Sequence, residues 1–389
     1  MLIGIVGAPN KGKSTLFSAL TLNDVDIADY PFTTINPNIG VTYATKPCPE
    51  KELKTKCKAR NSLCVDGIRK IPVNIIDVAG LVEGAHAGKG RGNQFLNDLA
   101  AADALMLVVD ASGKTDQAGN PCESCNPIDD VNMVMDELVE WLSSIITKHM
   151  AQLSKRTDGV NALAEVLTGL KINKEKIKSV IDSSHLSDSK IDWNEEGIRK
   201  FSTELLKVSK PLLIVANKCD MKGSEANVKL LKSEFGDKNV IAISGAIELA
   251  LKKAEKQGII SYAPGSGIEI IKKDITKEQL GALEYMQKFV KDSKSSAQEV
   301  VNGAVFGLLD NIVVYPVEDE NKYTDHFGNV LPDAILMRKG STAMDLAASI
   351  HTDIAKNMLY AIDARTKMRL AKDYILKDND VIKIVSAAK

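Results

Sequence analysis

The clearest chemical pattern in the chain lies between positions 7 and 15, where the sequence reads GAPNKGKST. Two glycines bound a loop that follows the apolar run 2–6 and precedes a helical pattern, as a phosphate-binding P-loop requires. Backbone N–H groups of such a loop and the positive end of the next helix point at one anion. Lys13 would reach the β- and γ-phosphates, and the Ser14 hydroxyl would bind Mg²⁺. The nucleotide-binding candidates here are Asn10, Lys11, Gly12, Lys13, Ser14 and Thr15.

Two later segments have the composition of switch regions. The buried strand predicted at 73–76 ends in Asp77-Val78-Ala79-Gly80, where the aspartate would hold Mg²⁺ through water and the glycine N–H would meet the γ-phosphate. The loop 27–34 offers Thr34, beside Thr33, to Mg²⁺ and the γ-phosphate. The glycine-rich stretch 81–92 predicts a second, mobile switch. Candidate catalytic residues are therefore Lys13, Thr34 and Gly80, and candidate Mg²⁺ ligands are Ser14, Thr34 and Asp77.

A third box indicates which base is bound. The strand predicted at 212–216 ends in Asn217-Lys218-Cys219-Asp220. The Asp220 carboxylate can accept N1–H and the exocyclic amino group of guanine, and a site built on such a pair rejects the mismatched base by roughly 10⁴–10⁵. The strand at 240–243 then delivers Ser244-Gly245-Ala246, whose N–H groups could meet the guanine O6. The nucleotide-binding candidates added here are Asp77, Asn217, Lys218, Asp220, Ser244, Gly245 and Ala246.

Strands that alternate with helical segments predict an α/β fold, a P-loop NTPase with a doubly wound, mostly parallel sheet covered on both faces. Residues 110–217 are too many for one crossover, and apolar residues at helical spacing behind Asp129 and Asp130, the cap candidates, predict a helical, coiled-coil-like insertion. Capping boxes at Thr276 and Ser296 open two further helices, and a small mixed α+β module follows. The predicted domains are 1–129 with 206–265 (nucleotide binding), 130–205 (insertion), 266–310 (helical linker) and 311–389.

Composition and charge limit the partners and the cellular location that we expect of this protein. The chain has 389 residues, 44% hydrophobic and 26% charged, with a net charge of -1, so no global basic field indicates DNA. No apolar run approaches a membrane span, and no basic n-region precedes the first apolar run, so we expect a cytoplasmic protein without membrane partners.

Six cysteines do not suggest a disulfide scaffold in a chain of this length. Cys48, Cys57 and Cys64 lie in the Lys- and Arg-rich stretch 46–70, and Cys122 and Cys125 form a C-x-x-C pair. Two interpretations stay open. The irregular spacing favours reduced thiols without a metal, whereas a zinc site assembled from these residues is the alternative.

With YPFTT at 30–34, DVAGLVEGAHAGKGRGNQFL at 77–96, NKCD and SGA added to the P-loop, the chain resembles GTPases of the Obg superfamily in the TRAFAC class. Within it, the chain is similar to the archaeal form of the YchF-like branch, and its tail resembles TGS domains, which are β-grasp modules with an α+β fold. The resemblance implies hydrolysis of GTP to GDP and phosphate with Mg²⁺, in a molecular switch associated with ribosomes or RNA in translation or ribosome assembly. The RNA-contact candidates are His351, Arg365, Lys367 and Arg369. The last three share one face if that segment is extended; the spacing favours a solvated face, and a local phosphate-binding stripe is the alternative.

Several residues of this chain bear on the GTP hydrolysis that the resemblance implies, and some of them depart from the family pattern. Leu81 stands where many GTPases keep a water-orienting glutamine, which implies a slow intrinsic rate, on the order of 10⁻⁴–10⁻² s⁻¹, raised by a partner. Asn10 matches the asparagine by which relatives hold K⁺, whereas His86 and Arg91 are interpreted as loop residues. Related TGS domains often have a glycine where this chain has Ala355-Lys356. Bacterial and eukaryotic relatives deviate at the guanine box and prefer ATP, so an ATP-preferring NTPase, or an RNA-binding protein with vestigial hydrolysis, is the alternative function.

Overall fold

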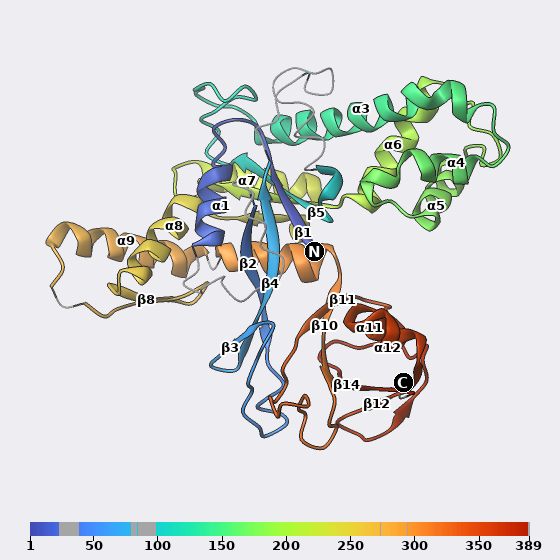
Figure 1. Cartoon of the computed structure of the whole chain (residues 1–389). Helices are drawn as coiled ribbons and strands as arrows, with labels where there is room; N and C mark the ends of the chain where they lie inside the picture. Colours follow the sequence, from blue (N-terminus) through green and yellow to red (C-terminus); the bar gives the residue numbers. More distant parts are fainter. Residues whose placement is uncertain (23–38, 79–83, 85–98, 273, 294, 388–389) are drawn as a thin grey trace. The chain divides into compact units, whose positions relative to one another are not determined.

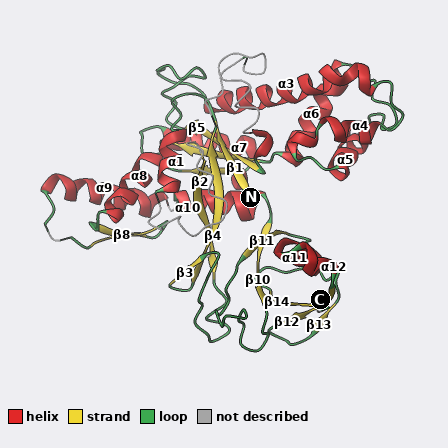
Figure 2. Cartoon of the chain, viewed as in Figure 1, coloured by secondary structure: helices red, strands yellow, loops and turns green. Residues whose placement is uncertain are grey.

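The structure, a computed structural model, describes residues 1–22, 39–78, 84, 99–272, 274–293 and 295–387 (Figures 1 and 2). The chain divides into two compact units. The described residues of the first unit lie within 1–22, 39–41 and 74–304, and those of the second within 42–73 and 305–387. None of the described helices is long and apolar enough to cross a membrane.

The first unit is organised around a parallel sheet. Its strand order is β2-β4-β1-β5-β6-β7, in which every pair from β4 to β7 is parallel and β3 pairs antiparallel with β4. The strands β1, β5 and β6 are near-continuous apolar runs, as expected where both faces of a parallel sheet are covered, and β5 is buried at every position. The predicted doubly wound α/β fold is confirmed. The strands are β1 (Leu2–Val6), β2 (Ile39–Pro47), β3 (Leu63–Val65), β4 (Ile68–Asp77), β5 (Ala104–Asp110), β6 (Leu212–Asn217) and β7 (Val240–Ala242). Residues 42–73, which include β3 and parts of β2 and β4, group with the second unit.

Helices connect these strands and close the first unit. Thr276 and Gln279 exchange side-chain-to-backbone hydrogen bonds of 3.0 and 3.2 Å before α9, and the Ser296 hydroxyl accepts from the Glu299 N–H at 3.2 Å, so both predicted caps are present. The elements are α1 (Lys13–Thr21), α7 (Ser224–Phe235), a 3₁₀ turn (Asp237–Asn239), α8 (Gly245–Lys256), the hairpin β8 (Ile260–Ala263) and β9 (Gly267–Ile270), α9 (Lys277–Ser293), α10 (Ala297–Asn302) and a π-helical turn (Gly303–Leu308).

The predicted helical insertion is a packed group of four helices, which Figure 1 shows in green at the upper right. The helices are α3 (Pro127–Leu153), α4 (Gly159–Val166), α5 (Lys174–Ser184) and α6 (Glu195–Ser209), with a 3₁₀ turn at Thr168–Leu170. It is therefore not a two-helix coiled coil, because α4 and α5 complete one core with α3 and α6. The predicted cap is also wrong: Asn126 caps α3 with its side chain, and Asp129 and Asp130 lie in the first turn.

The second unit contains a five-stranded sheet of order β11-β10-β14-β12-β13. The central pair β10 and β14 is parallel and the other pairs are antiparallel. Helix α11 covers one face, where Leu346 packs with Val314, and the alternate residues Val313 and Tyr315 face a second core that includes Cys48. The predicted β-grasp module is thus present. Its elements are β10 (Asn311–Val317), β11 (Ile335–Arg338), α11 (Ala343–Ile350), α12 (Thr352–Lys356), β12 (Met358–Asp363), β13 (Arg369–Leu370) and β14 (Val381–Ser386).

Candidate nucleotide site

The P-loop joins β1 to α1 and depends on two glycines in left-handed or otherwise glycine-favouring backbone. Gly7 has φ +145°, and a Cβ there would lie 2.4 Å from the Val108 carbonyl oxygen. Gly12 has φ +95°, and its Cβ would lie 2.2 Å from Nδ2 of Asn217. Both positions therefore exclude a side chain for conformational and steric reasons. Helix α1 begins directly afterwards at Lys13, which directs its N-terminal N–H groups at the loop.

Lys13 and Ser14 sit where the sequence places the phosphate and magnesium chemistry. The buried Lys13 ammonium donates to the Ala8 carbonyl at 2.8 Å. Burial lowers the pKa of Lys13, Asp77 opposes this shift, and Lys11 adds to it; an anion bound beside the ammonium would stabilise its charged form. The Ser14 hydroxyl donates to Oδ2 of Asp77 at 2.8 Å. A hydroxyl and a carboxylate are the oxygen donors that Mg²⁺ prefers, so this pair fits that ion.

Asn217 connects the phosphate loop with the base-specific loops. It is buried at the end of β6, and its Nδ2 donates to the Lys11 carbonyl at 2.8 Å while its Oδ1 accepts from the Gly245 N–H at 2.9 Å. Ser244 caps α8 through the Ile247 N–H, so Gly245 and Ala246 form the first turn of that helix. Three sequence-predicted segments are thus brought together by one side chain.

A buried polar network that the sequence analysis missed supports the same loops. Asp110, opposite Asn217 in the sheet register, accepts from Lys218 at 2.8 Å and from Thr115 at 2.7 Å. Burial opposes ionisation of Asp110, but these hydrogen bonds and one from Ser112 hold its pKa below the ordinary value. The sequence did contain one sign of this network: Asp110 is a carboxylate that ends a fully buried strand.

The network continues from Thr115 to the helical insertion. The fully buried Lys11 donates to the Thr115 carbonyl at 2.9 Å and pairs with Asp130 of α3 at 2.8 Å. Since this side chain points away into the network, the part of Lys11 that remains for a nucleotide is its backbone. Thr15, the last P-loop candidate, is half-buried in the first turn of α1.

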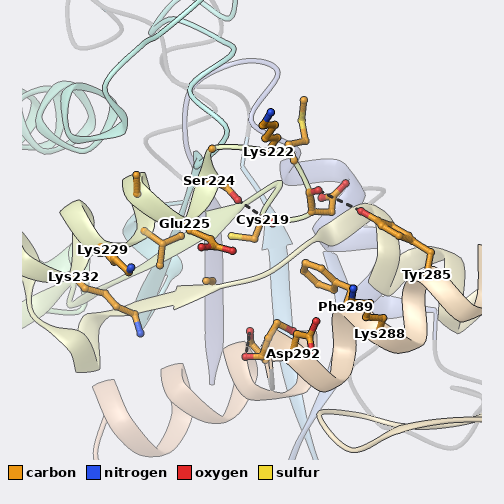
Figure 3. Close-up of a pocket in the computed structure, with 18 residues that line it drawn as sticks. Cys219, Lys222, Ser224, Glu225, Lys229, Lys232, Tyr285, Lys288, Phe289 and Asp292 are labelled. Atoms are coloured by element: carbon orange, nitrogen blue, oxygen red, sulfur yellow. Dashed lines mark hydrogen bonds between the residues drawn. The ribbon is translucent and has the colours of Figure 1, made fainter.

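Asp220 lies beside a cavity of about 1160 Å³, shown in Figure 3. Its backbone oxygen accepts from the Tyr285 hydroxyl of α9 at 3.3 Å. The cavity lies between the start of α7 and the α9 side chains Tyr285 and Phe289. Its lining includes neither a P-loop residue nor Asn217, so it adjoins the predicted base site without coinciding with it.

Of the remaining predicted site residues, the structure describes Asn10 but not Thr34 or Gly80. Asn10 has φ 62°, and its Nδ2 donates to the Gly119 carbonyl at 2.9 Å, which leaves the amide oxygen as the atom that could bind K⁺. Thr34 and Gly80 lie outside the described residues, as do Thr33, Leu81, His86 and Arg91. Gly84 is described, and its N–H donates to Oε1 of Glu137 on α3 at 2.6 Å.

The basic triplet in the second unit does not form the shared face that an extended segment would give. Residues 364–368 form a turn, and Lys367 has φ 63°. Arg365 makes a two-pronged ion pair with Glu52, at 2.8 and 3.1 Å, and Arg369 stacks on Tyr360 at 3.8 Å. The His351 side chain is exposed and caps α12. The condition for a shared face, an extended segment, is therefore not met, because the turn sends each side chain to a different partner.

The cysteines also separate into two groups. Cys122 and Cys125 form a disulfide in the first unit, so the interpretation that they are reduced thiols is wrong for this pair. Cys48, Cys57 and Cys64 are free and converge in the second unit, although 9 and 7 positions separate them in the sequence.

A P-loop, a serine and aspartate pair behind it and a base-specific loop, all at the carboxyl edge of a parallel sheet, define a P-loop GTPase. Three family models agree: "50S ribosome-binding GTPase" matches residues 2–149, "Obg-like GTPase YGR210-like, G4 motif-containing domain" matches 215–319, and "TGS domain" matches 327–386. A GTP-binding protein of Methanocaldococcus jannaschii is 52% identical, with 100% of both chains covered. The chain therefore belongs to the Obg-like, YchF-type GTPases.

Two solved structures and a further relative are also similar to this chain. The GTP binding protein of Pyrococcus horikoshii superimposes with a TM-score of 0.82 at 38% identity, covering 100% of each chain. The YchF GTPase of Schizosaccharomyces pombe shares the fold, with a TM-score of 0.59 at 23% identity over 99% of this chain and 97% of that one. Obg-like ATPase 1 of Rattus norvegicus is 28% identical, over 98% of this chain and 91% of its own length.

Proposed function

We propose that this chain is a GTP-hydrolysing switch in which the phosphate half and the guanine half of the site work as one unit. The observation that supports it best is Asn217, whose side chain bonds both the Lys11 carbonyl and the Gly245 N–H. A base held by Asp220 and the Ser244–Ala246 turn is thereby kept in register with phosphates held by the P-loop. Binding at one end therefore positions the other.

Guanine is the base that the site favours. Asp220 offers a carboxylate to N1–H and the exocyclic amino group of guanine, and adenine presents no matching pair of donors. The relative named Obg-like ATPase 1 makes ATP the competing candidate. Competition of ATP against labelled GTP distinguishes the two. GTP preference by orders of magnitude supports the proposal, and equal competition contradicts it.

Mg²⁺ would be held by Ser14, by Thr34 and, through water, by Asp77, and it would neutralise charge on the transferred phosphoryl group. The chain's own residues supply the rest. Lys13 would bind the β- and γ-phosphates, the P-loop N–H groups would orient them, and the Gly80 N–H would donate to the γ-phosphate. The Asn10 amide oxygen would hold K⁺ near the same phosphates, so we expect turnover to be faster in K⁺ than in Na⁺ buffer.

The output of the switch is proposed to be a conformational change read by ribosomes or RNA in the cytoplasm. Two observations support this: the matched family described as ribosome-binding GTPases and the C-terminal TGS module. Leu81 cannot orient a water, so intrinsic turnover should be slow and a partner should raise it.

The test is GTP turnover in K⁺ buffer with and without purified ribosomes. A large ribosome-dependent rise supports the proposal, and an unchanged slow rate contradicts its ribosome part while retaining the GTPase. Lys13→Ala is the control for contaminating hydrolysis. His351→Ala and Arg369→Ala test the second unit, because they should reduce ribosome stimulation without changing the intrinsic rate.

A further inference from the structure

Three cysteines and one glutamate converge in the second unit, on the face of its sheet opposite α11. The ligand atoms of Cys48, Glu50, Cys57 and Cys64 all lie within 4.8 Å of one another. Cys48 comes directly after β2 and Cys64 lies in β3, while Cys57 lies in the loop between them. Their spacing gives no recognisable metal motif, and the fold alone brings them together.

The donor set matches one kind of ion. Three thiolates and a carboxylate are ligands that zinc accepts in tetrahedral sites, and Zn–S bonds of about 2.3 Å place the sulfurs of such a site about 3.8 Å apart. Separations of up to 4.8 Å therefore require the four groups to close by about 1 Å or less. Soft thiolate ligands select zinc over the hard ions Mg²⁺ and Ca²⁺.

A buried arginine supplies an independent argument for negative charge at this position. Arg69 is fully buried, and its Nη1 donates to Sγ of Cys57 at 2.6 Å while its Nη2 donates to the Leu331 and Pro332 carbonyls. Among the ion pairs of the described residues, none includes Arg69. A buried guanidinium needs an anion. Zinc bound by three thiolates and a carboxylate carries two excess negative charges and would provide it.

Backbone hydrogen bonds around this loop orient the candidate ligands and fix the loop in place. The Cys57 N–H donates to Oε2 of Glu50 at 2.9 Å, which orients that carboxylate, and the Cys48 N–H donates to the Gly67 carbonyl at 2.8 Å. The Lys58 and Arg60 N–H groups bond to residues 330 and 332, next to the sheet. Such orienting bonds around ligands are a common property of metal sites.

Ordinary packing does not explain this cluster. Free cysteines often behave as small apolar residues, and Cys48 does contact the core of Tyr315 and Val313. Packing alone would not place a carboxylate among three sulfurs and a charged guanidinium against one of them, Cys57. A disulfide would use only two of the three thiols.

We propose that Cys48, Cys57, Cys64 and Glu50 form a structural zinc site, with Arg69 as a positioning residue that donates to a ligand sulfur. Four protein ligands leave no open position, so the site is structural and not catalytic. Zinc would cross-link the 48–64 segment to itself, joining the residue after β2 and the intervening loop to β3. The site is independent of the proposed GTP hydrolysis.

The test is the metal content of the full chain, purified without chelator under reducing conditions. We expect one zinc per chain. After removal of zinc by a chelator, Co²⁺ titration should give thiolate-to-cobalt charge-transfer absorption together with the d–d bands of a tetrahedral site. Single Cys→Ser variants at 48, 57 or 64 should lose the zinc, whereas Cys219→Ser, a free cysteine of the first unit, should keep it.

Arg69→Gln distinguishes a positioning role from a purely structural one. It should keep the tetrahedral cobalt spectrum and weaken metal affinity roughly 10–100-fold. Because a cysteine variant could lose metal by unfolding, the chelated wild type is the second measurement: its unfolding temperature should fall and should recover on addition of zinc. Chain that is reduced and folded, yet holds no stoichiometric zinc and gives no cobalt charge-transfer band, overturns the proposal. A disulfide between any two of the three cysteines in freshly purified chain overturns it as well.

Discussion

Replacing Asn217 by alanine tests whether the two halves of the nucleotide site are mechanically joined. The change removes one hydrogen bond of 2.8 Å to the Lys11 carbonyl and one of 2.9 Å from the Gly245 N–H, and both partners lie in a buried environment. Each buried group left without its partner costs about 1–3 kcal/mol, and entry of water into the vacated space lowers the total. We therefore expect the free energy of unfolding of the first unit to fall by about 2–4 kcal/mol.

The same change should weaken nucleotide binding in a variant that is still folded. The P-loop and the Gly245 turn would no longer be held in register, and a loss of at least about 1.4 kcal/mol corresponds to a tenfold rise in Kd. Urea denaturation followed by circular dichroism gives the stability, and titration calorimetry with GTP below the unfolding range gives the Kd.

Asn227→Ala is the matched control, because its Nδ2 makes a single bond of 2.9 Å, to the Ala111 carbonyl, outside the proposed site. We expect a loss of about 1 kcal/mol in stability and an unchanged Kd for GTP. If Asn217→Ala behaves like this control in both measurements, the reasoning that Asn217 couples the two halves is refuted.

Three further changes test other parts of the site and fold. Asp220→Ala should reduce the ratio of ATP to GTP dissociation constants, roughly 10⁴ or more in the wild type, to near unity, and a retained preference in competition binding would show that another group reads the base. Ser14→Ala should weaken GTP binding in Mg²⁺ more than in chelator, whereas an equal loss in both titrations would contradict its magnesium role. Burial lowers the pKa of Lys210 from 10.5 to about 8, so the unfolded chain binds more protons between these values and stability should rise with pH across that window. Denaturation near pH 7 and pH 10 should show the wild type gaining roughly 1–3 kcal/mol over Lys210→Met, and parallel pH profiles would count against this assignment.

The sequence predicted features whose determinants are local. Apolar runs, capping boxes and the P-loop spacing each lie within a few residues, which is why the strands at 73–76, 105–109 and 212–216 and the caps at Thr276 and Ser296 were found. The turn at 364–368 was missed although it is local, because the period of two in the basic residues favoured an extended segment.

Features that depend on long-range packing were not predicted. Lys11 and Asp130 are 119 positions apart, and the sequence offered Asp130 only as a helix cap. The grouping of residues 42–73 with the C-terminal strands follows from a core that includes Ile71 and Tyr315. No pattern of residue spacing in the sequence predicts this grouping. The sequence offered a site assembled from Cys48, Cys57 and Cys64 only as an alternative, because their convergence also depends on packing between distant segments.

Helix α3 has a mechanical consequence for the nucleotide site. Its first turn is tied to the P-loop through Asp130 and Lys11, and two turns later, on the same face, Glu137 accepts from the Gly84 N–H. With 27 residues the helix is about 40 Å long, and both attachments lie near one end. If the helix tilted as a rigid rod about this end, a tilt of about 5° would displace its far end by about 3.5 Å over that length. A shift too small to alter the sheet would thus be amplified at the outer end of the helical insertion.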